Sequence, residues 1–253
     1  MSLTRAHELP HAFSAPDWSE HWGLAVVDPG SATGLVVAYR RSAVSVSVAA
    51  AVFTAGDRVV ALVADDLVVP RAGYEVRGPG IWADLVCEEP GARWTLGLEA
   101  MAVTLDDPRH AVGHGRGDPT PLGWDLDLDD EPGPDLTPAT GPGSEGGAYG
   151  RGCRVRGEVL VGAGSLEIDG WGRRHHSWGP GAVPLAGRFA WVGVDAAPRH
   201  LVGAAVPDAS PLAEVWLPGP IRHLMLAWGH GTEAGVGWSI ELGERAGEPA
   251  PAI

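Results

Sequence analysis

The chain has 253 residues, 45% of them hydrophobic, and carries 18 Lys and Arg against 32 Asp and Glu, a formal net charge of −14. This acidity argues against nucleic acid as a partner, because nucleic acid needs a basic footprint, and against an anionic membrane surface. The longest apolar tract, around Ala43 to Phe53, is too short to cross a bilayer, so we expect no membrane insertion. The first residues hold no apolar signal-peptide core, and we expect a cytoplasmic protein.

Alternation of apolar and polar residues, which is typical of β-strands, recurs from near the start of the chain to its end. Valines at 44, 46 and 48 alternate with serines, and a turn at 55–57 leads into the apolar run 59–63, which predicts a β-hairpin. Further strands are predicted, in chain order, at 94–98, 155–161, 166–168, 189–194, 224–228 and 236–242. Helical periodicity is confined to the acidic, partly apolar start, and 37 Gly and 22 Pro indicate many turns. The sequence therefore predicts an all-β fold.

The composition changes between residues 106 and 147, where Pro, Gly, Asp and Thr dominate around a short strand-like insert at 124–128. We interpret this stretch as a long connection between two β units. The first unit would cover residues 1–145 and end in this Gly/Pro-rich connection, and the second would cover residues 146–253. Strands of this kind bury one face by closing into barrels or by pairing two sheets, and a barrel of this size can hold one small ligand.

The two cysteines, Cys87 and Cys153, lie far apart and fit no metal-binding spacing. Disulfide scaffolds are usually small and secreted, so we expect two free, buried thiols. The composition leaves the oligomeric state open.

The segment 169–180 concentrates two histidines, two arginines and two tryptophans between glycines. If it is extended, His176 shares a face with Arg174 and Trp178, and His175 lies on the other face. An arginine close by lowers the pKa of a histidine, which favours a neutral imidazole that can accept a proton. The alternative, about equally open, is structural: one histidine caps a turn and the other is solvated.

A carboxyl group beside tryptophan rings is the second candidate for chemistry. Its pKa can be raised there, and it can then act as a general acid. Glu99 is the candidate, although it alternates out of phase with Leu96 and Leu98, which favours an exposed side chain. The same ambiguity applies to Asp84, Asp169, Asp195 and Glu214.

Tryptophans are frequent in the predicted strands, with only 3 Phe and 3 Tyr in the chain. Core packing explains most of them, but a pocket formed by several would suit a long apolar or polyene-like molecule, and a tryptophan face can stabilise a cation. They are Trp82, Trp94, Trp171, Trp178, Trp191, Trp216, Trp228 and Trp238.

Metal and cofactor motifs are missing from the sequence. Adjacent histidines rarely ligate one metal, and His110 and His114 lie in a glycine-rich stretch with no Glu or Cys at a matching spacing, so we expect no metal. The chain has no GxSxG elbow, phosphate loop or dinucleotide glycine pattern, and we expect no cofactor.

Three segments carry a resemblance to a known family: the run 149–159 (YGRGCRVRGEV), then 168–172 (IDGWG) and 176–180 (HSWGP). Together they resemble the second half of the carotenoid hydratase and AttH-like superfamily, and the first half agrees more loosely at 19–22, 93–99 and 124–128. The resemblance implies two lipocalin-like, calycin-type β-barrel or sheet units packed together around a ligand cavity. It also implies chemistry on apolar natural products, either hydration of terpenoid double bonds or pericyclic closure of polyketide-derived chains.

The resemblance also implies site residues. The family motif falls on Tyr149, Arg154, Arg174, His176 and Trp178, and the looser match falls on Glu99. The family usually has aspartate at the place of His175 and glutamine at the place of Arg151. If that aspartate is the acid of the hydratases, its replacement argues against hydration by the same route.

We therefore expect a cofactor-independent enzyme that cyclises, isomerises or hydrates a small apolar polyene, terpenoid or polyketide-derived molecule by acid–base and shape control. His176 or His175 would transfer a proton or donate a hydrogen bond, Arg174 would anchor a substrate oxygen and Glu99 would supply the carboxylate. The pocket would be formed by Trp178, Trp171, Trp191, Tyr149 and Arg154. The alternatives are a non-catalytic carrier of an apolar small molecule and a family member with a structural role.

Overall fold

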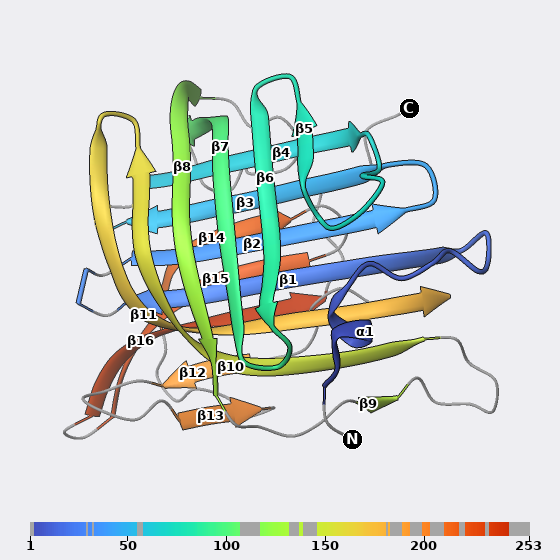
Figure 1. Cartoon of the computed structure of the whole chain (residues 1–253). Helices are drawn as coiled ribbons and strands as arrows, with labels where there is room; N and C mark the ends of the chain where they lie inside the picture. The colour runs from blue at the N-terminus through green and yellow to red at the C-terminus, as the bar shows by residue number, and fades with distance from the viewer. Residues whose placement is uncertain are drawn as a thin grey trace.

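The computed structural model describes residues 3–28, 30–31, 33–54, 58–106, 117–131, 137–138, 146–180, 182, 189–192, 199–202, 210–217, 221–230 and 233–242 (Figure 1). From residue 189 onward the description covers the backbone of the strands. One short helix, α1 (Arg5–Glu8), precedes the first strand, and the described elements after it are strands.

One large antiparallel sheet dominates the molecule. Its strands are β1 (Trp18–Asp28), β2 (Thr33–Ser42), β3 (Val46–Thr54), β4 (Arg58–Leu67), β5 (Val76–Gly78), β6 (Ile81–Glu89), β7 (Arg93–Leu105), β8 (Gly117–Asp130), β9 (Thr137–Pro138), β10 (Gly147–Val161) and β11 (Gly164–Pro180). They follow the order β4-β3-β2-β1-β11-β10-β8-β7-β6-β5, with β9 beside β10, and β4 also pairs with β7. This last pairing closes a ring through β1–β4, β7, β8, β10 and β11. The all-β, lipocalin-like fold expected from the sequence is confirmed.

The ring is flattened into two layers whose strands cross, with β1–β4 in one layer and β5–β8 in the other (Figure 1). The long hairpin β10–β11 joins them: residues 153–161 of β10 pair with β8, and residues 171–180 of β11 pair with β1. A strand rises about 3.3 Å per residue, so 15 or 17 residues reach from one layer to the other.

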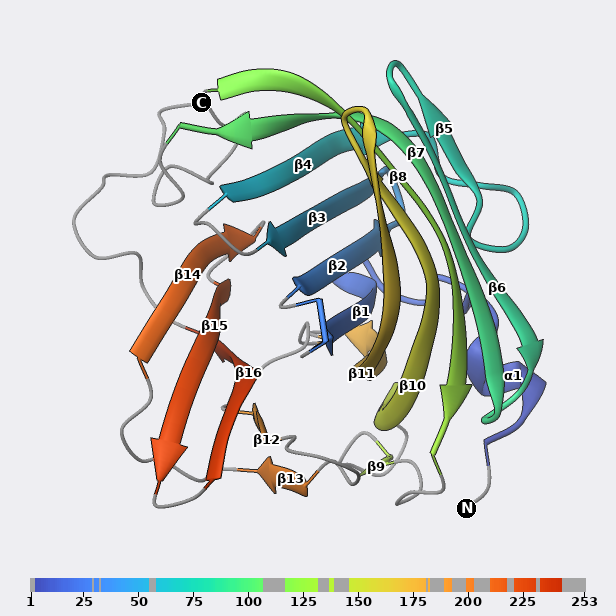
Figure 2. The same cartoon turned by 90° about the vertical axis from the view of Figure 1, so that its left-hand side faces the viewer.

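The main core lies between the two layers. Alternate residues of each strand point inward, as in β7, where Trp94, Leu96 and Leu98 are buried. A second apolar cluster, which includes Ala25 and Phe53, belongs to the opposite face of β1–β4. On that side lies the sheet of β14 (Ser210–Leu217), β15 (Ile221–His230) and β16 (Glu233–Leu242), whose outer strands approach β3 and β1 (Figure 2). Contacts on two faces explain why nearly all residues of β1 and β3 are buried.

The remaining two strands, β12 (Phe189–Val192) and β13 (Arg199–Val202), pair only with each other among the described strands, and β12 approaches β16. The strands predicted at 189–194, 224–228 and 236–242 correspond to β12, β15 and β16. The predicted turn at 55–57 lies outside the described residues.

The insert predicted at 124–128 is a full strand of 14 residues, β8. Its prolines argue against a strand in the sequence, because proline cannot donate a hydrogen bond to a neighbouring strand. Pro119 and Pro121 precede the stretch that pairs with β10, so there β8 hydrogen-bonds only to β7 in the sheet. The division at residue 145 stays a prediction; β10 and β11, which follow that residue, hydrogen-bond to β8 and β1 in the large sheet.

Both cysteines are buried and free, as expected. Burial raises the pKa of the Cys87 thiol to about 11 and raises that of Cys153 further, so neither is a thiolate at neutral pH. In the part of the chain that the structure describes, no helix is long and apolar enough to cross a membrane.

The fold predicts a strong effect of a methyl group at Gly157 in β10. Its φ of 143° is unfavourable for other residues, and a Cβ there would lie 2.0 Å from the carbonyl oxygen of Asp125 on β8. We expect Gly157→Ala to lower the free energy of unfolding by about 3 kcal/mol in denaturant titrations. The control Gly164→Ala, whose nearest new contact is 3.5 Å away, should stay within about 0.5 kcal/mol of the parent. Equal effects would contradict this assignment.

Candidate functional site

The histidine-rich segment lies in strand β11, and its side chains alternate between the two faces of that strand. Arg174 and His176 are fully buried, and Trp178 lies on the same face with its ring 5.0 Å from that of His176. His175 is half-buried on the opposite face, opposite Gly23 of β1 and Gly150 of β10. The alternation predicted from the sequence is therefore present, and only one of the two histidines belongs to the buried cluster described next.

The carboxylate of Glu20, at the start of β1, is the centre of a buried hydrogen-bond network. Its Oε1 lies 2.8 Å from Nε2 of His176 and 2.9 Å from Nδ1 of His11, and it accepts a 3.1 Å hydrogen bond from the hydroxyl of Tyr74. Its Oε2 accepts a 3.2 Å bond from Arg41. One carboxylate thus gathers two imidazoles, a phenol and a guanidinium.

Burial alone would raise the pKa of Glu20, but the hydrogen bonds from His11 and His176 lower it to about 2. Burial also lowers the pKa of His176, against the opposing effect of Glu20. At neutral pH the pair is therefore a carboxylate and a neutral imidazole. Because an ionised carboxylate only accepts hydrogen bonds, we assign the imidazole proton to Nε2.

Nδ1 of His176 is then a bare acceptor. It is buried and has no hydrogen-bond partner. A buried polar atom without a partner costs about 1–3 kcal/mol and calls for an explanation, of which a catalytic role is one. Carboxylate, imidazole and a free ring nitrogen are the parts of a general base whose orientation and tautomer the carboxylate holds.

A second buried ionic group surrounds Arg174. Its Nε and Nη2 bind the carboxylate of Asp130 at 2.8 and 2.5 Å, and its Nη2 and Nη1 bind that of Glu8 at 3.0 and 3.2 Å. The hydroxyl of Tyr149 accepts a 2.7 Å bond from Nη1 and donates to Glu8. The Gly91 N–H also donates to Glu8, at 3.0 Å. These groups raise the pKa of the buried guanidinium despite its burial, so it stays charged.

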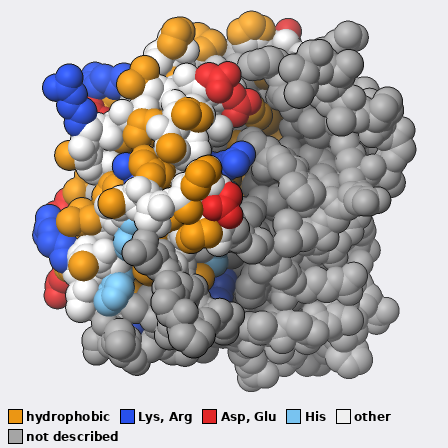
Figure 3. Space-filling view, turned by 90° about the vertical axis from the view of Figure 1, so that its right-hand side faces the viewer, with side chains coloured by type: hydrophobic (Ala, Val, Ile, Leu, Met, Phe, Trp, Pro, Cys, Tyr) orange, Lys and Arg blue, Asp and Glu red, His pale blue; other side chains and the backbone are white. Residues whose placement is uncertain are grey.

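Residues 3–17, here called the covering segment, close this end of the molecule. Glu8 and His11 belong to it, and the ring of His11 stacks on Trp178 at 4.0 Å. Tyr74 ties the two ionic groups together, because its hydroxyl also contacts the Glu8 carbonyl at 3.2 Å and Nε2 of His176 at 3.3 Å. Figure 3 shows that hydrophobic, acidic, basic and histidine side chains are mixed over the described part of this face.

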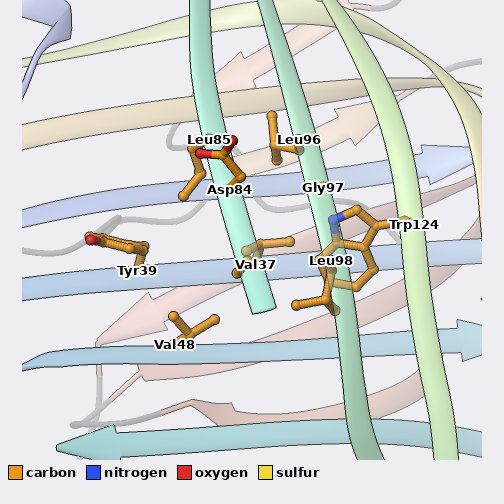
Figure 4. A pocket seen from close by; sticks show the side chains of 10 residues that line it. Val37, Tyr39, Val48, Asp84, Leu85, Leu96, Gly97, Leu98 and Trp124 are labelled. Atoms are coloured by element: carbon orange, nitrogen blue, oxygen red, sulfur yellow. The ribbon is translucent and has the colours of Figure 1, made fainter. Parts of the chain in front are cut away.

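The side chains that the structure describes between the two layers pack closely. A cavity of about 10 Å³ lies between Val37, Tyr39 and Val48 of one layer and residues such as Leu98 and Trp124 of the other (Figure 4). That volume holds about one water molecule. Tyr39 connects the cavity with the site, because its ring packs edge-on against Tyr74 at 5.6 Å. A ligand larger than water therefore does not fit this cavity unless the residues that line it move.

The Glu20 network also has metal-ligand chemistry. Nitrogen or oxygen atoms of His11, Glu20 and His176 lie within 4.8 Å of one another, the one such group among the described residues. In the structure these atoms are joined directly by hydrogen bonds. The expectation of a metal-free protein stays a prediction.

Other residues predicted for the site lie elsewhere. Glu99 is exposed on β7, on the face opposite Leu96 and Leu98. Arg154 and Trp171 lie on the outer face, where the guanidinium sits 4.4 Å above the indole and binds Asp169 at 2.8 Å. The side chain of Trp191, in β12, lies outside the described residues.

Sequence reasoning missed Glu8, His11, Glu20, Tyr74 and Asp130. Two signals were available: Glu20 lies in the segment 19–22 that carries part of the family resemblance, and Asp130 ends an alternating run of aspartates. Neither signal indicates which partner each carboxylate meets.

The fold and this cluster define the chain as a lipocalin-like all-β protein with ionised side chains buried at one end of its interior. The family described as "Domain of unknown function (DUF7064)" matches residues 4–205, and the chain belongs to this family. No curated protein matches the chain.

Two solved proteins are similar in structure. One, from Nitrosomonas europaea and provisionally named AttH, is 12% identical with a TM-score of 0.39, and the match covers 95% of this chain and 98% of that protein. The other is CghA, crystallised with Sch210972, which is 10% identical with a TM-score of 0.33. That match covers 90% of this chain and 58% of CghA, so the chain spans little more than half the length of CghA. A protein named AttH, the group that the sequence motifs resemble, is thus among the matches.

The neutral, buried His176 predicts a stability that falls on acidification. Its pKa is lowered in the folded chain, so between that value and the ordinary value of 6.5 the unfolded chain binds one more proton, and the free energy of unfolding decreases as pH falls through this window. His21, whose burial lowers its pKa to about 4, acts in the same direction.

Each such histidine contributes a slope of about 1.4 kcal/mol per pH unit. Denaturant titrations between pH 6.5 and 5 should give a slope for His176→Gln that is lower than the parent's, by at most about this amount. Identical slopes would show that the pKa of His176 is not lowered in the folded protein.

Proposed function

We propose that this protein is a cofactor-independent enzyme that acts on a small apolar natural product, a polyene, terpenoid or polyketide-derived chain, by acid–base catalysis at His176. The observation that carries the proposal is the buried pair of Glu20 and His176 with Nδ1 left unpartnered. The resemblance of the segments around Tyr149 and His176 to the carotenoid hydratase and AttH-like superfamily supports the substrate class.

The pair favours reactions that move a proton. A neutral imidazole at Nδ1 can remove a proton from substrate, and the imidazolium that results is stabilised by the ionised Glu20 and can return the proton elsewhere. Double-bond isomerisation and hydration both need such a step, and cyclisation uses it where ring closure ends in proton loss. Arg174 would serve to anchor an oxygen of the substrate, and the rings of Trp178 and Tyr149 would border the reacting atoms.

The departure from the family at His175 affects this proposal little. The residue before His176 lies on the opposite face of β11, half-buried and away from the buried carboxylates. An aspartate there would not extend the pair of Glu20 and His176. The acid–base function is therefore better attributed to Glu20, on β1, than to the position before the histidine.

A non-catalytic binding or structural role is the second candidate, and the small interior cavity favours it. An enzyme for a polyene has to open by more than the space of one water molecule. The two functions differ in what happens to protons on the bound molecule, which gives a test that needs no knowledge of the product.

The first test measures proton exchange. The purified protein is incubated in D₂O with farnesol, lycopene and an unsaturated polyketide-like acid such as sorbic acid, and deuterium in the recovered molecules is measured by mass spectrometry. We expect exchange into at least one of them. His176→Ala should lower its rate by about 100-fold or more while the ligand still binds, and Glu20→Gln should lower it as well. Binding without exchange would favour the carrier.

His175→Ala is the matched control, because it removes the adjacent imidazole from the opposite face of the same strand. We expect exchange within a few-fold of the parent. Exchange unchanged in both histidine variants would contradict the role given to His176.

Removal of metal ions separates acid–base from metal chemistry at the same residues. After dialysis against EDTA we expect the exchange rate to stay unchanged, because His11, Glu20 and His176 are joined by direct hydrogen bonds. A loss of exchange that Zn²⁺ or Fe²⁺ restores would contradict the proposal and make the three residues metal ligands.

A further inference from the structure

The two carboxylates on Arg174 come from different parts of the molecule. Asp130 is the last residue of β8 and binds one edge of the guanidinium, whereas Glu8 belongs to the covering segment and binds the adjacent edge. The Cζ atom of the guanidinium also lies 5.1 Å from the ring centroid of Trp94 and 5.1 Å from that of Tyr149. The strands thus hold Arg174 and Asp130 in place without any contribution from residues 3–17.

Four donors converge on the carboxylate of Glu8: two N–H groups of Arg174, the hydroxyl of Tyr149 and the N–H of Gly91. All four belong to β11, β10 or the turn between β6 and β7. Arginine bound end-on with further N–H and O–H donors is how proteins recognise carboxylates. The framework therefore forms a complete carboxylate pocket, and only its occupant belongs to the covering segment.

Charge and burial mark this occupant as unusual. Asp130 alone balances the charge of Arg174, so Glu8 adds a second negative charge in the interior. Glu8 is also the one residue of the covering segment that is fully buried, while apolar Leu9 beside it is 38% exposed. A segment held down for its packing would bury its leucine and expose its glutamate.

Beyond the Glu8 carboxylate, the covering segment is held by hydrogen bonds and by ring contacts, among them His7 beside Trp178 and Phe13 edge-on to Trp18. Tyr74 binds the Glu8 carbonyl, and both Glu20 and Arg41 bind His11. The ring of His11 stacks on Trp178, and the ring of Phe13 lies beneath the guanidinium of Arg41. α1 has only four residues, too few for a stable helix by itself. Water can replace the hydrogen bonds among these contacts once the segment lifts.

We propose that the pocket of Arg174, Tyr149 and Gly91 binds the carboxylate of an apolar carboxylic acid, and that Glu8 occupies it until the covering segment is displaced. The inference rests on the proposed function and narrows its substrate class to apolar acids. Tyr74 contacts both the Glu8 carbonyl and His176, so a ligand carboxylate in this pocket would place the adjoining carbon chain beside the imidazole. Displacement of residues 3–17 would also open space beside the imidazole of His176.

The first experiment vacates the pocket. Glu8→Ala should lower the melting temperature, and acetate should restore at least half of the loss in a saturable manner that sodium chloride at equal ionic strength does not reproduce. The control Glu75→Ala removes an exposed carboxylate that binds Arg77 and should show no saturable response to acetate. An equal response to acetate and chloride would overturn the carboxylate pocket.

The second experiment tests the ligand class by calorimetry with decanoate and its uncharged match, decanol. Glu8→Ala should bind decanoate at least 10-fold more tightly than the parent does, with no such gain for decanol. Adding Tyr149→Phe should weaken decanoate binding several-fold, because one donor is lost. Should Glu8→Ala not fold, Glu8→Gln keeps the shape of the side chain without its charge. This variant should still bind decanoate more tightly than the parent does. Equal affinity for decanoate and decanol, or no gain on removing Glu8, would overturn the inference.

The two proposals can fail separately. His176 gives no donor to the carboxylate pocket, so His176→Ala should keep the preference of the pocket for decanoate over decanol whether or not His176 is catalytic. Decanoate binding without any proton exchange would refute the proposed catalysis and leave the pocket standing. Exchange on an uncharged polyene, dependent on His176 but with no preference for carboxylates, would refute the pocket alone.

Discussion

Ionised side chains buried inside a β-sheet structure have to satisfy one another, and the rest of this protein is arranged around that constraint. A charge moved out of water costs several kcal/mol unless an opposite charge and hydrogen bonds compensate it. Glu20 and Arg174 are both fully buried and each meets several partners. The loss of one partner would leave the others buried without compensation, so the strands that contribute them are held to a single register.

That register is provided by the long hairpin β10–β11. It pairs with β8 on one side and β1 on the other, so one element places Tyr149, Arg174 and His176 beside groups from both layers. A slip by one residue would exchange the faces of β11 and put His175 in the place of His176. The close approach of Gly157 to the backbone of β8 resists such a slip, because only glycine fits there.

Local pattern predicted the strands well and the site in part. Alternation separated His176 from His175, and the same parity shows why Trp171 and Arg154 lie on the outer face: Trp171 is out of phase with His176, and Arg154 is out of phase with Tyr149. The partners of His176 could not be predicted in this way. Glu20 reaches it through the pairing of β1 with β11, across 156 positions of the chain, and Glu8 lies in a segment without strand periodicity. Long-range pairing is absent from local pattern, and a lone glutamate in a polar stretch is ordinarily exposed.

The two ionic groups differ in what holds them, and this difference links the buried side chains to the proposed function. Arg174, Asp130 and Tyr149 belong to strands, and so do Glu20 and His176, whereas Glu8 and His11 belong to the covering segment. Lifting that segment would leave the strand-borne groups in place, with Arg174 still paired to Asp130 and Glu20 still paired to His176 and Arg41. A donor pocket and a base would then face the space left open. The structure with residues 3–17 in place is therefore compatible with a reactive state in which only those residues are displaced and the sheet keeps its arrangement.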